Sequence, residues 1–169
     1  MTSSKLTARE LCVLSLIAAL MMGTKVAMAA LPNIHLNAVF IILAATVFGW
    51  KAMYAIAVYV LLEGVVFGFG IWWISYLYVW PLFCAVCVLL RKNESVLLWA
   101  VAAGIFGLSF GALCSLPYLF IGGWSMAVSY WAGGILFDLT HCAGNFVLTL
   151  ILYKPLKKVF SLSKKQADT

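Results

Sequence analysis

Long apolar runs separated by short polar breaks constrain this chain more than any other feature of its sequence. Of the 169 residues, 66% are apolar and only 9% are charged. A soluble domain of this length needs a surface rich in charge, whereas continuous apolar runs of about twenty residues are long enough to cross a bilayer. The sequence therefore predicts an all-α integral membrane protein with little room for a soluble domain.

Charged residues, glycines and prolines divide the chain into six apolar segments. The segments span about 9–31, 35–49, 52–68, 71–90, 96–120 and 126–156. Lys5 and Arg9 make the first segment look like a signal peptide, but its apolar run continues to Leu31 and is long enough to span. We expect residues 1–169 to form a single domain, a compact bundle of six transmembrane helices.

Basic residues are distributed unequally between the two sides of such a bundle. With six spans, ten of the 11 lysines and arginines fall on one side, at the termini, at Lys51 or in the loop 91–95. Only Lys25 falls on the other side. Because the cytoplasmic segments of membrane proteins are enriched in Lys and Arg, both termini are expected to be cytoplasmic.

The last segment carries a polar stripe formed by Asp138, His141 and Asn145. Their spacing of i, i+3 and i+7 places them on one face of a helix. Ionisable side chains within a membrane cost about 2.5–3.5 kcal/mol on insertion scales and usually face the protein interior or a wet cavity. The stripe is therefore either part of a ligand pocket or a clamp between helices, in which Asp138 could pair with Lys25.

Further polar and aromatic residues fall in the outer half of the bundle, which suggests a cavity that opens outward. These candidates are His35, Asn37, Glu63, Trp72, Trp73 and Tyr76. Glu63 has close neighbours Gly64 and Gly68, which favours a packing role for it. The aromatic residues form either an interfacial belt or a set of rings that stack on an aromatic ligand.

Small residues recur every four positions in two of the segments. The ridges are Ser15, Ala19, Gly23 and Ala27 in the first segment, and Ala103, Gly107, Gly111 and Ser115 in the fifth. Such ridges let helix backbones approach closely in lipid. They predict either packing within the bundle or docking faces for another membrane subunit.

Motifs for catalysis or metal binding are weak. Cys84 and Cys87 form a Cys-x-x-Cys inside an apolar segment, where inert packing is favoured over a redox dithiol. His35 and His141 lie on different segments without further ligands, so we expect no metal site. Phosphate-binding glycine loops, nucleophile elbows and paired catalytic carboxylates do not occur, and we expect no cofactor.

Four stretches of the chain match a known family in their order and spacing. They are LPNIHLNAVFIILAATVFGWKA (31–52), LEGVVFGFGIWWISYLYVWPL (62–82), GALCSLPYLFIGGW (111–124) and FDLTHCAGNFVLTLILYKPL (137–156). Together they resemble the substrate-binding S component of energy-coupling factor (ECF) transporters, over about residues 8–158. The resemblance implies a multi-pass protein of a prokaryotic plasma membrane that binds a vitamin or related micronutrient from outside.

The resemblance also implies partners and residue roles. An S component is not an enzyme; it docks on a membrane T component and two ATP-hydrolysing ABC subunits, and topples to release its substrate inside. The family's Ala-x-x-x-Ala motif on the first helix corresponds to Ser15 and Ala19, with Ser in place of the first Ala. Related sequences often carry an acidic residue where His35 stands. The family's outer pocket maps onto Trp72, Trp73, Tyr76, Asp138, His141 and Asn145.

These residues narrow the substrate only to a chemical class. Trp and Tyr rings with one carboxylate, one imidazole and one amide suit a small hydroxylated heteroaromatic compound, such as a vitamin B6 form or hydroxymethylpyrimidine. A queuosine precursor or cobalamin remains an alternative substrate. The alternatives of another class are a small membrane dithiol oxidoreductase that uses Cys84 and Cys87, and a structural assembly subunit in which the polar stripe only joins helices.

Overall fold

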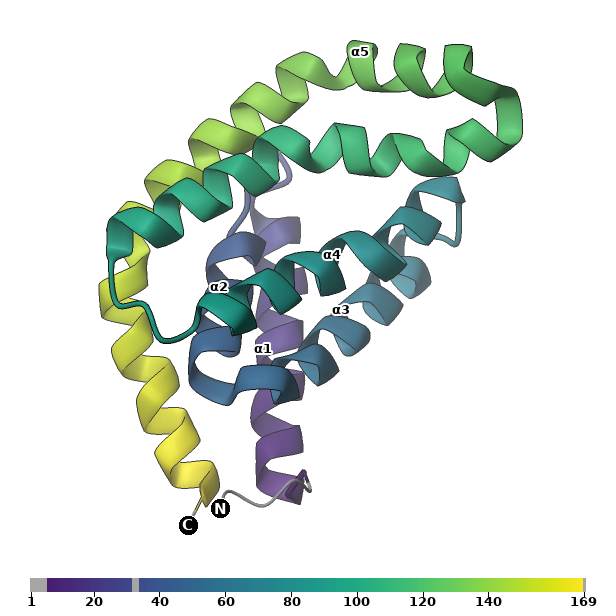
Figure 1. Ribbon diagram of the computed structural model, residues 1–169. Coiled ribbons are helices and arrows are strands. Elements are labelled where there is room, and N and C mark those ends of the chain that lie inside the picture. The colour runs from purple at the N-terminus through teal and green to yellow at the C-terminus, as the bar shows by residue number, and fades with distance from the viewer. Residues whose placement is uncertain (1–5, 32–33, 169) are drawn as a thin grey trace.

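All regular elements are helical in the part of the chain that the computed structural model describes, residues 6–31 and 34–168. The elements are α1 (Ala8–Ala27), α2 (Asn37–Phe48), the 3₁₀ helix η1 (Gly49–Lys51), α3 (Ala52–Phe67), α4 (Ile71–Leu90) and α5 (Val96–Asp168). In Figure 1, α5 runs across the other helices, reverses direction and returns to the end of the molecule where both termini lie. The predicted all-α fold class is confirmed for these residues.

Four helical stretches of the described chain are long and apolar enough to cross a membrane. They are Ala8–Ala27, Asn37–Phe67, Ile71–Leu90 and Val96–Ala167. Large apolar side chains are exposed along them, for example Phe120 at 92% and Leu89 at 75%. Soluble monomers rarely expose extended apolar surface, so the fold fits the helical membrane protein that the composition predicts.

The stretch Asn37–Phe67 is interrupted by a sharp turn at Gly49. This residue has a φ of 60°, which favours glycine, and an added Cβ would collide with the guanidinium of Arg91. On the N-terminal side of the turn, α2 has 12 residues, of which all but Thr46 and Val47 are buried. It contacts α1, α3, α4 and α5. Apolar residues lie on every side of this helix, which is the pattern expected of a helix that other helices surround.

α5 is folded back on itself at Gly122 and Gly123. Gly122 leaves helical geometry with a φ of −140° and ψ of 16°, and Gly123 has a φ of 70°. The break separates an N-terminal arm (96–121) from a C-terminal arm (124–168), which run back along each other in Figure 1. The segments predicted at 96–120 and 126–156 fall on these two arms, but the C-terminal arm continues well beyond residue 156.

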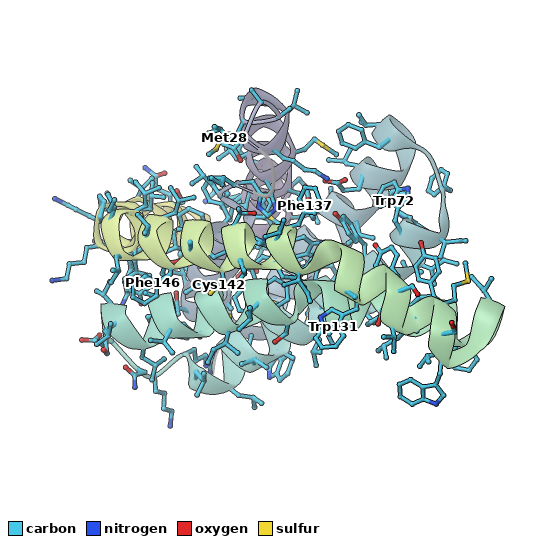
Figure 2. All side chains as sticks on the ribbon, turned by 90° about the horizontal axis from the view of Figure 1, so that it is seen from above. Met28, Trp72, Trp131, Phe137, Cys142 and Phe146 are labelled. Atoms are coloured by element: carbon cyan, nitrogen blue, oxygen red, sulfur yellow. The ribbon has the colours of Figure 1, made fainter. Side chains whose placement is uncertain are left out.

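Small residues allow the two arms of α5 to lie close together. An added Cβ on Gly107 would lie 2.8 Å from the backbone of His141, and one on Gly104 would lie 3.5 Å from Cys142 Sγ. Figure 2 shows Cys142 and Phe146 between the arms. The small-residue ridge of the fifth predicted segment therefore packs inside the molecule.

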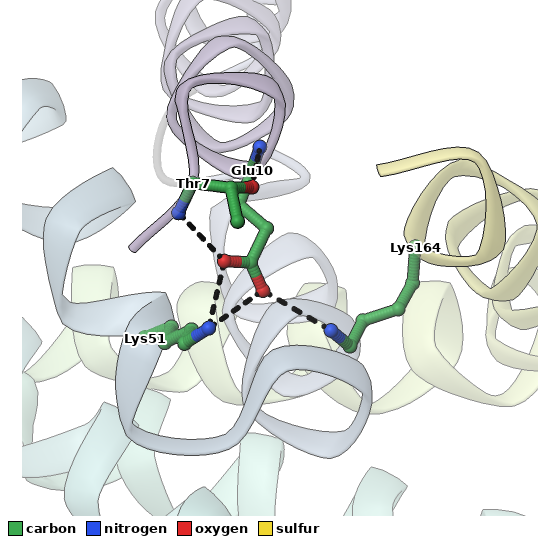
Figure 3. A network of polar contacts seen from close by, with 4 residues as sticks. All are labelled: Thr7, Glu10, Lys51 and Lys164. Atoms are coloured by element: carbon green, nitrogen blue, oxygen red, sulfur yellow. Dashed lines mark hydrogen bonds and ion pairs between the residues drawn. The ribbon is translucent and has the colours of Figure 1, made fainter. Parts of the chain in front are cut away.

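A buried cluster at the terminal end joins segments that are far apart in sequence (Figure 3). Glu10, which is 1% exposed, accepts hydrogen bonds from Thr7 N at 3.0 Å, Lys51 Nζ at 2.7 and 2.8 Å, and Lys164 Nζ at 3.2 Å. Thr7 and Glu10 also form a capping box that begins α1. This Glu10 cluster explains why the C-terminal arm stays helical past the predicted end: Lys164 holds it against α1 and η1.

Candidate functional site

A cavity of about 310 Å³ lies where the end of α1 meets α3, α4 and both arms of α5. Figure 2 looks onto this end of the molecule, with Met28 just after α1. We call it the histidine cavity. It is lined by Lys25, Val26, Met28, Ala29, Leu31, Ile34, His35, Phe67, Tyr76, Phe110 and His141.

Two histidines from distant parts of the chain meet in this cavity. The ring centroids of His35 and His141 are 5.0 Å apart, with the rings edge to face at 66°. His141 is 1% exposed, and neither its Nε2 nor the Nδ1 of His35 has a hydrogen-bond partner among the described residues. Buried polar atoms are almost always hydrogen-bonded in native proteins, to protein or to ordered water, so these two imidazole atoms have hydrogen-bonding capacity that the described chain does not use.

Aromatic rings surround the two histidines. Phe110 lies with its ring centroid 5.0 Å from that of His141, and Trp80 lies 6.1 Å from His35. Tyr76 packs edge to face against Trp80, with centroids 5.5 Å apart. The indole Nε1 of the fully buried Trp80 has no partner either. Flat rings arranged in this way can hold a flat ligand by stacking and edge contacts.

An ion pair stands at the edge of the histidine cavity. Lys25 Nζ lies 2.6 Å from Glu63 Oε2, and it also lies over the rings of Phe67 and Tyr76, at 4.9 and 5.5 Å from their centroids. Glu63 is completely buried, and its Oε1 has no partner within the described chain. The suggestion that Asp138 pairs with Lys25 is therefore wrong, because Glu63 occupies that position.

Asn37 lies deeper, behind the aromatic rings. Its Nδ2 donates a hydrogen bond of 2.6 Å to the hydroxyl of Tyr59, whose ring centroid lies 5.8 Å from that of Trp80. Asn37 Oδ1 is another buried atom that lacks a partner. Asn37 does not line the histidine cavity, so it has no direct contact with that space.

The three members of the polar stripe have different surroundings. Asp138 Oδ1 accepts a hydrogen bond of 2.9 Å from Gly111 N, and Asn145 Nδ2 donates one of 3.2 Å to Ala103 O. Both bonds join the two arms of α5, whereas His141 lies between them and lines the cavity. Asp138 and Asn145 therefore join helices, as the clamp interpretation predicted, while His141 alone of the three lines the histidine cavity.

Asp138 also borders a second cavity, of about 360 Å³, between the arms of α5. Phe110 lines both cavities and forms a wall between them. Gly133 and Gly134 leave open space in the second cavity, since an added Cβ on either would meet nothing within 4 Å. Asp138 Oδ2 is buried without a partner in the described chain.

The two tryptophans predicted for the pocket lie outside the histidine cavity. Trp73 donates a hydrogen bond of 2.8 Å from its Nε1 to Val60 O and packs between α3 and α4. Trp72, labelled in Figure 2, packs edge to face on Tyr76 with centroids 5.2 Å apart. Trp72 thus supports a ring that lines the cavity without lining it itself.

Among the remaining candidates, the ridge of the first segment lies on an open face of α1. Ala19, Gly23 and Ala27 are exposed, Ser15 is partly exposed, and an added Cβ on Gly23 would meet nothing within 4 Å. Most of this ridge is therefore uncovered, unlike the buried ridge of the N-terminal arm.

The cysteines and potential metal ligands form no reactive cluster in the described chain. Cys84 and Cys87 are both 0% exposed and carry free thiols within the apolar core. The described residues contain no group of three or more His, Cys, Asp or Glu side chains that could hold a metal ion.

Sequence reasoning missed Phe110, which lines the histidine cavity, and Tyr59, which packs on Trp80. Trp80 belongs to the aromatic run 72–80, for which the sequence left open an interfacial belt or a pocket, and it is fully buried beside His35. Phe110 and Tyr59 look like ordinary apolar positions of their helices, and only the packing of distant helices brings them to the site. No family model, curated protein or solved structure matches the chain, so the site is interpreted from its own geometry.

Proposed function

We propose that this chain is the substrate-binding membrane subunit of an ECF-type importer and binds a small heteroaromatic micronutrient in the histidine cavity. The observation that supports this best is the pair of buried, unpartnered imidazole atoms on residues that line the cavity, His35 Nδ1 and His141 Nε2. Trp80 Nε1 and Glu63 Oε1 also lack a partner in the described chain, but they belong to fully buried residues that contact the lining residues His35 and Lys25 and do not line the cavity themselves. Each unsatisfied atom destabilises the empty protein by about 1–3 kcal/mol. A ligand or bound water that supplies the missing partners would recover this energy.

The types of these atoms describe the ligand. Among the polar groups that line the cavity, each imidazole nitrogen of His35 and His141 can donate or accept a hydrogen bond according to its tautomer, and the Lys25 ammonium can only donate one. A ring that carries both a nitrogen acceptor and hydroxyl donors meets these requirements. A vitamin B6 form or hydroxymethylpyrimidine has this chemistry.

The size of the cavity also favours a small ligand. Its volume of about 310 Å³ is at the lower end of the range for small-molecule sites, roughly 300–1,000 Å³. Cobalamin is far larger than this space, whereas a queuosine precursor remains an alternative. The dithiol alternative gains no support, because Cys84 and Cys87 are both completely buried, whereas reactive thiols are accessible.

We further propose that the chain crosses the membrane six times, with both termini in the cytoplasm. The turns at Gly49 and at Gly122–Gly123 divide the two longest apolar stretches into antiparallel halves, and Figure 1 has both termini at one end. The ten-to-one distribution of basic residues favours this end as the cytoplasmic side. With 12 residues, or about 18 Å, α2 is too short to span alone and would cross only inside the bundle.

The partners would be a membrane T component and two ABC ATPase subunits that meet the chain at α1. The ridge of Ser15, Ala19, Gly23 and Ala27 supports this choice, because it is the small-residue ridge left uncovered by the bundle. Small residues allow a second helix to approach the α1 backbone closely in lipid.

Blocking the histidine cavity tests the proposed function directly. Ala29 lines the cavity, and its neighbour Ala30 is exposed without lining it, so Ala29→Phe and Ala30→Phe form a matched pair. Ligands extracted from the purified proteins are identified by mass spectrometry. We expect a small heteroaromatic compound from wild type and Ala30→Phe, and none from Ala29→Phe. Equal recovery from both variants, or no such compound from any of the three, would overturn the proposal.

A further inference from the structure

A separate polar cavity of about 360 Å³ lies near the terminal end of the molecule. It is formed by the C-terminal arm of α5 and by the connection between α4 and α5, which Figure 1 shows beside that arm. Sixteen residues, or about 24 Å along the helix, separate His141 from Lys157, so this cavity is remote from the histidine cavity. We call it the lysine cavity. Its lining residues are Glu94, Val96, Tyr153, Lys154, Lys157, Lys158 and Ser161.

Five of the lining residues form one face of the C-terminal arm. They fall at helical spacing, with 153, 157 and 161 four residues apart and 154 and 158 beside them. Their side chains therefore lie on the same side of the helix. Tyr153 stacks on the fully buried Trp99, with ring centroids 6.2 Å apart, and Lys157 Nζ lies 5.4 Å from the centroid of the Tyr153 ring. The packing of these rings holds the cavity wall in position.

The cavity has more positive charge and donor capacity than its own residues use. Three lysines face one carboxylate, and Glu94 is 88% exposed and 3.8 Å from Lys157, a geometry that contributes little. Tyr153 is 1% exposed, and its hydroxyl has no hydrogen-bond partner in the described chain. Ammonium groups and hydroxyls gathered in this way suit an anion with several acceptor oxygens, such as a phosphate.

Exposed apolar side chains lie next to the lysine cavity in sequence, toward the middle of each arm of α5. Leu97 on the N-terminal arm is 59% exposed, and Ile151, two residues before Tyr153, is 63% exposed. Lys154 follows directly after the apolar run of the C-terminal arm, so the positive groups lie where that run ends. A phosphate in the cavity would therefore have its apolar continuation beside exposed apolar side chains.

We propose that the lysine cavity binds the phosphate of an anionic phospholipid, whose acyl chains lie along the exposed apolar surface of α5. Basic pockets between membrane helices on the cytoplasmic side are suited to such headgroups. The phosphodiester accepts hydrogen bonds from the Tyr153 hydroxyl and charge-assisted ones from Lys157 and Lys158. This site is independent of what the histidine cavity binds and requires only that the chain lies in a membrane.

Native mass spectrometry of the detergent-purified protein tests the site, with phosphatidylglycerol and phosphatidylcholine of the same acyl chains as probes. We expect wild type to retain phosphatidylglycerol in preference to phosphatidylcholine. Lys157→Ala and Lys158→Ala should each reduce this retention about fivefold. Tyr153→Phe keeps the ring on Trp99 and removes only the hydroxyl, so it should weaken retention severalfold without affecting the fold.

Lys165→Ala is the matched control, because Lys165 is exposed on the same helix and does not line the cavity. An equal loss in Lys165→Ala would mean that the whole basic end attracts anionic lipid diffusely, and would overturn the site. Unchanged binding in Tyr153→Phe would also overturn it, since the hydroxyl would then have no ligand. If inorganic phosphate displaces phosphatidylglycerol completely at millimolar concentration, the site recognises free phosphate and the lipid assignment is wrong.

Discussion

Glu10 and Glu63 are both buried carboxylates paired with lysine, but the fold completes only one of the two pairs. They meet opposite ends of α1: Glu10 lies in its first turn, and Glu63 binds Lys25, fifteen residues or about 22 Å farther along. Both oxygens of Glu10 accept hydrogen bonds from at least two donors. Glu63 has one bonded oxygen and one without a partner in the described chain.

The difference separates an ion pair that the fold completes from one that it leaves partly bonded. A fully bonded network fixes the segments that contribute to it, whereas a partly bonded one lowers stability unless another molecule completes it. The Glu10 cluster therefore fits a clamp on the chain ends, whereas Glu63 holds Lys25 at the edge of the cavity for which we propose ligand binding. The two carboxylates are equally buried, and they differ in the number of lysines that they hold and in the hydrogen-bonding capacity that is left unused.

The largest expected effect is on stability at the Glu10 cluster. Glu10→Gln removes the charge that holds two lysines and should lower the free energy of unfolding by about 3 kcal/mol. Glu63→Gln should lower it by only about 1 kcal/mol, because Glu63 holds one lysine through one oxygen, whereas Glu10 holds two lysines through both. Denaturation of both variants in the same detergent measures the difference. Equal losses would mean that both pairs are structural.

Ligand affinity should respond in the opposite way. His141→Ala removes a side chain that lines the histidine cavity and should weaken binding of the compound recovered from wild type about tenfold, or 1.4 kcal/mol. Glu10→Gln should leave the affinity of the folded fraction unchanged, because Glu10 is remote from the cavity. Titration calorimetry on the two variants checks this. If Glu10→Gln weakened binding as much as His141→Ala, the Glu10 cluster could not be a purely structural site distinct from the histidine cavity.

Asn145→Ala tests whether the polar stripe really has two roles. The substitution removes the hydrogen bond to Ala103 O and should lower the free energy of unfolding by about 1 kcal/mol. Affinity should stay within about twofold of wild type, because Asn145 does not line the cavity. A tenfold loss of affinity with unchanged stability would place Asn145 in the binding site beside His141.

Lys164→Ala should have the smallest effect of the four. Lys51 already contacts both oxygens of Glu10, and the Lys164 side chain is 27% exposed, so its removal should cost about 0.5 kcal/mol. Lys165→Ala removes the same charge from an exposed position and should change nothing measurable. A loss as large as that of Glu10→Gln would show that Lys164, rather than Lys51, dominates the Glu10 cluster.

Local sequence patterns predict where the helices lie better than they predict what the side chains meet. α4 occupies the residues 71–90 that the apolar run indicated, because the glycines of GFG (68–70) and the polar RKNES (91–95) interrupt the helix at its two ends. The helical extension to Asp168 was missed because the charged tail is stabilised by tertiary contacts, such as Lys164 with Glu10, rather than by an apolar run.

The candidate site was predicted only in part, for a geometric reason. Helical spacing places Asp138, His141 and Asn145 on one face, but the neighbouring arm of α5 covers that face unevenly. Its backbone therefore hydrogen-bonds to Asp138 and Asn145, whereas His141 lines the cavity. Likewise the sequence does not show whether Asp138 or Glu63 pairs with Lys25. Only the placement of α3 against α1 brings Glu63 to it.

The short, enclosed helix α2 has a consequence for how the chain is assembled during synthesis. A translocon that recognises about twenty apolar residues meets α2 and α3 as one 31-residue stretch, Asn37–Phe67. The helices that enclose α2 on its other sides include α4 and α5, which leave the ribosome later. Its side chains must therefore face lipid or the insertion machinery until the second half of the protein has entered. The most buried helix of the finished molecule is among the first to be made and among the last to be covered.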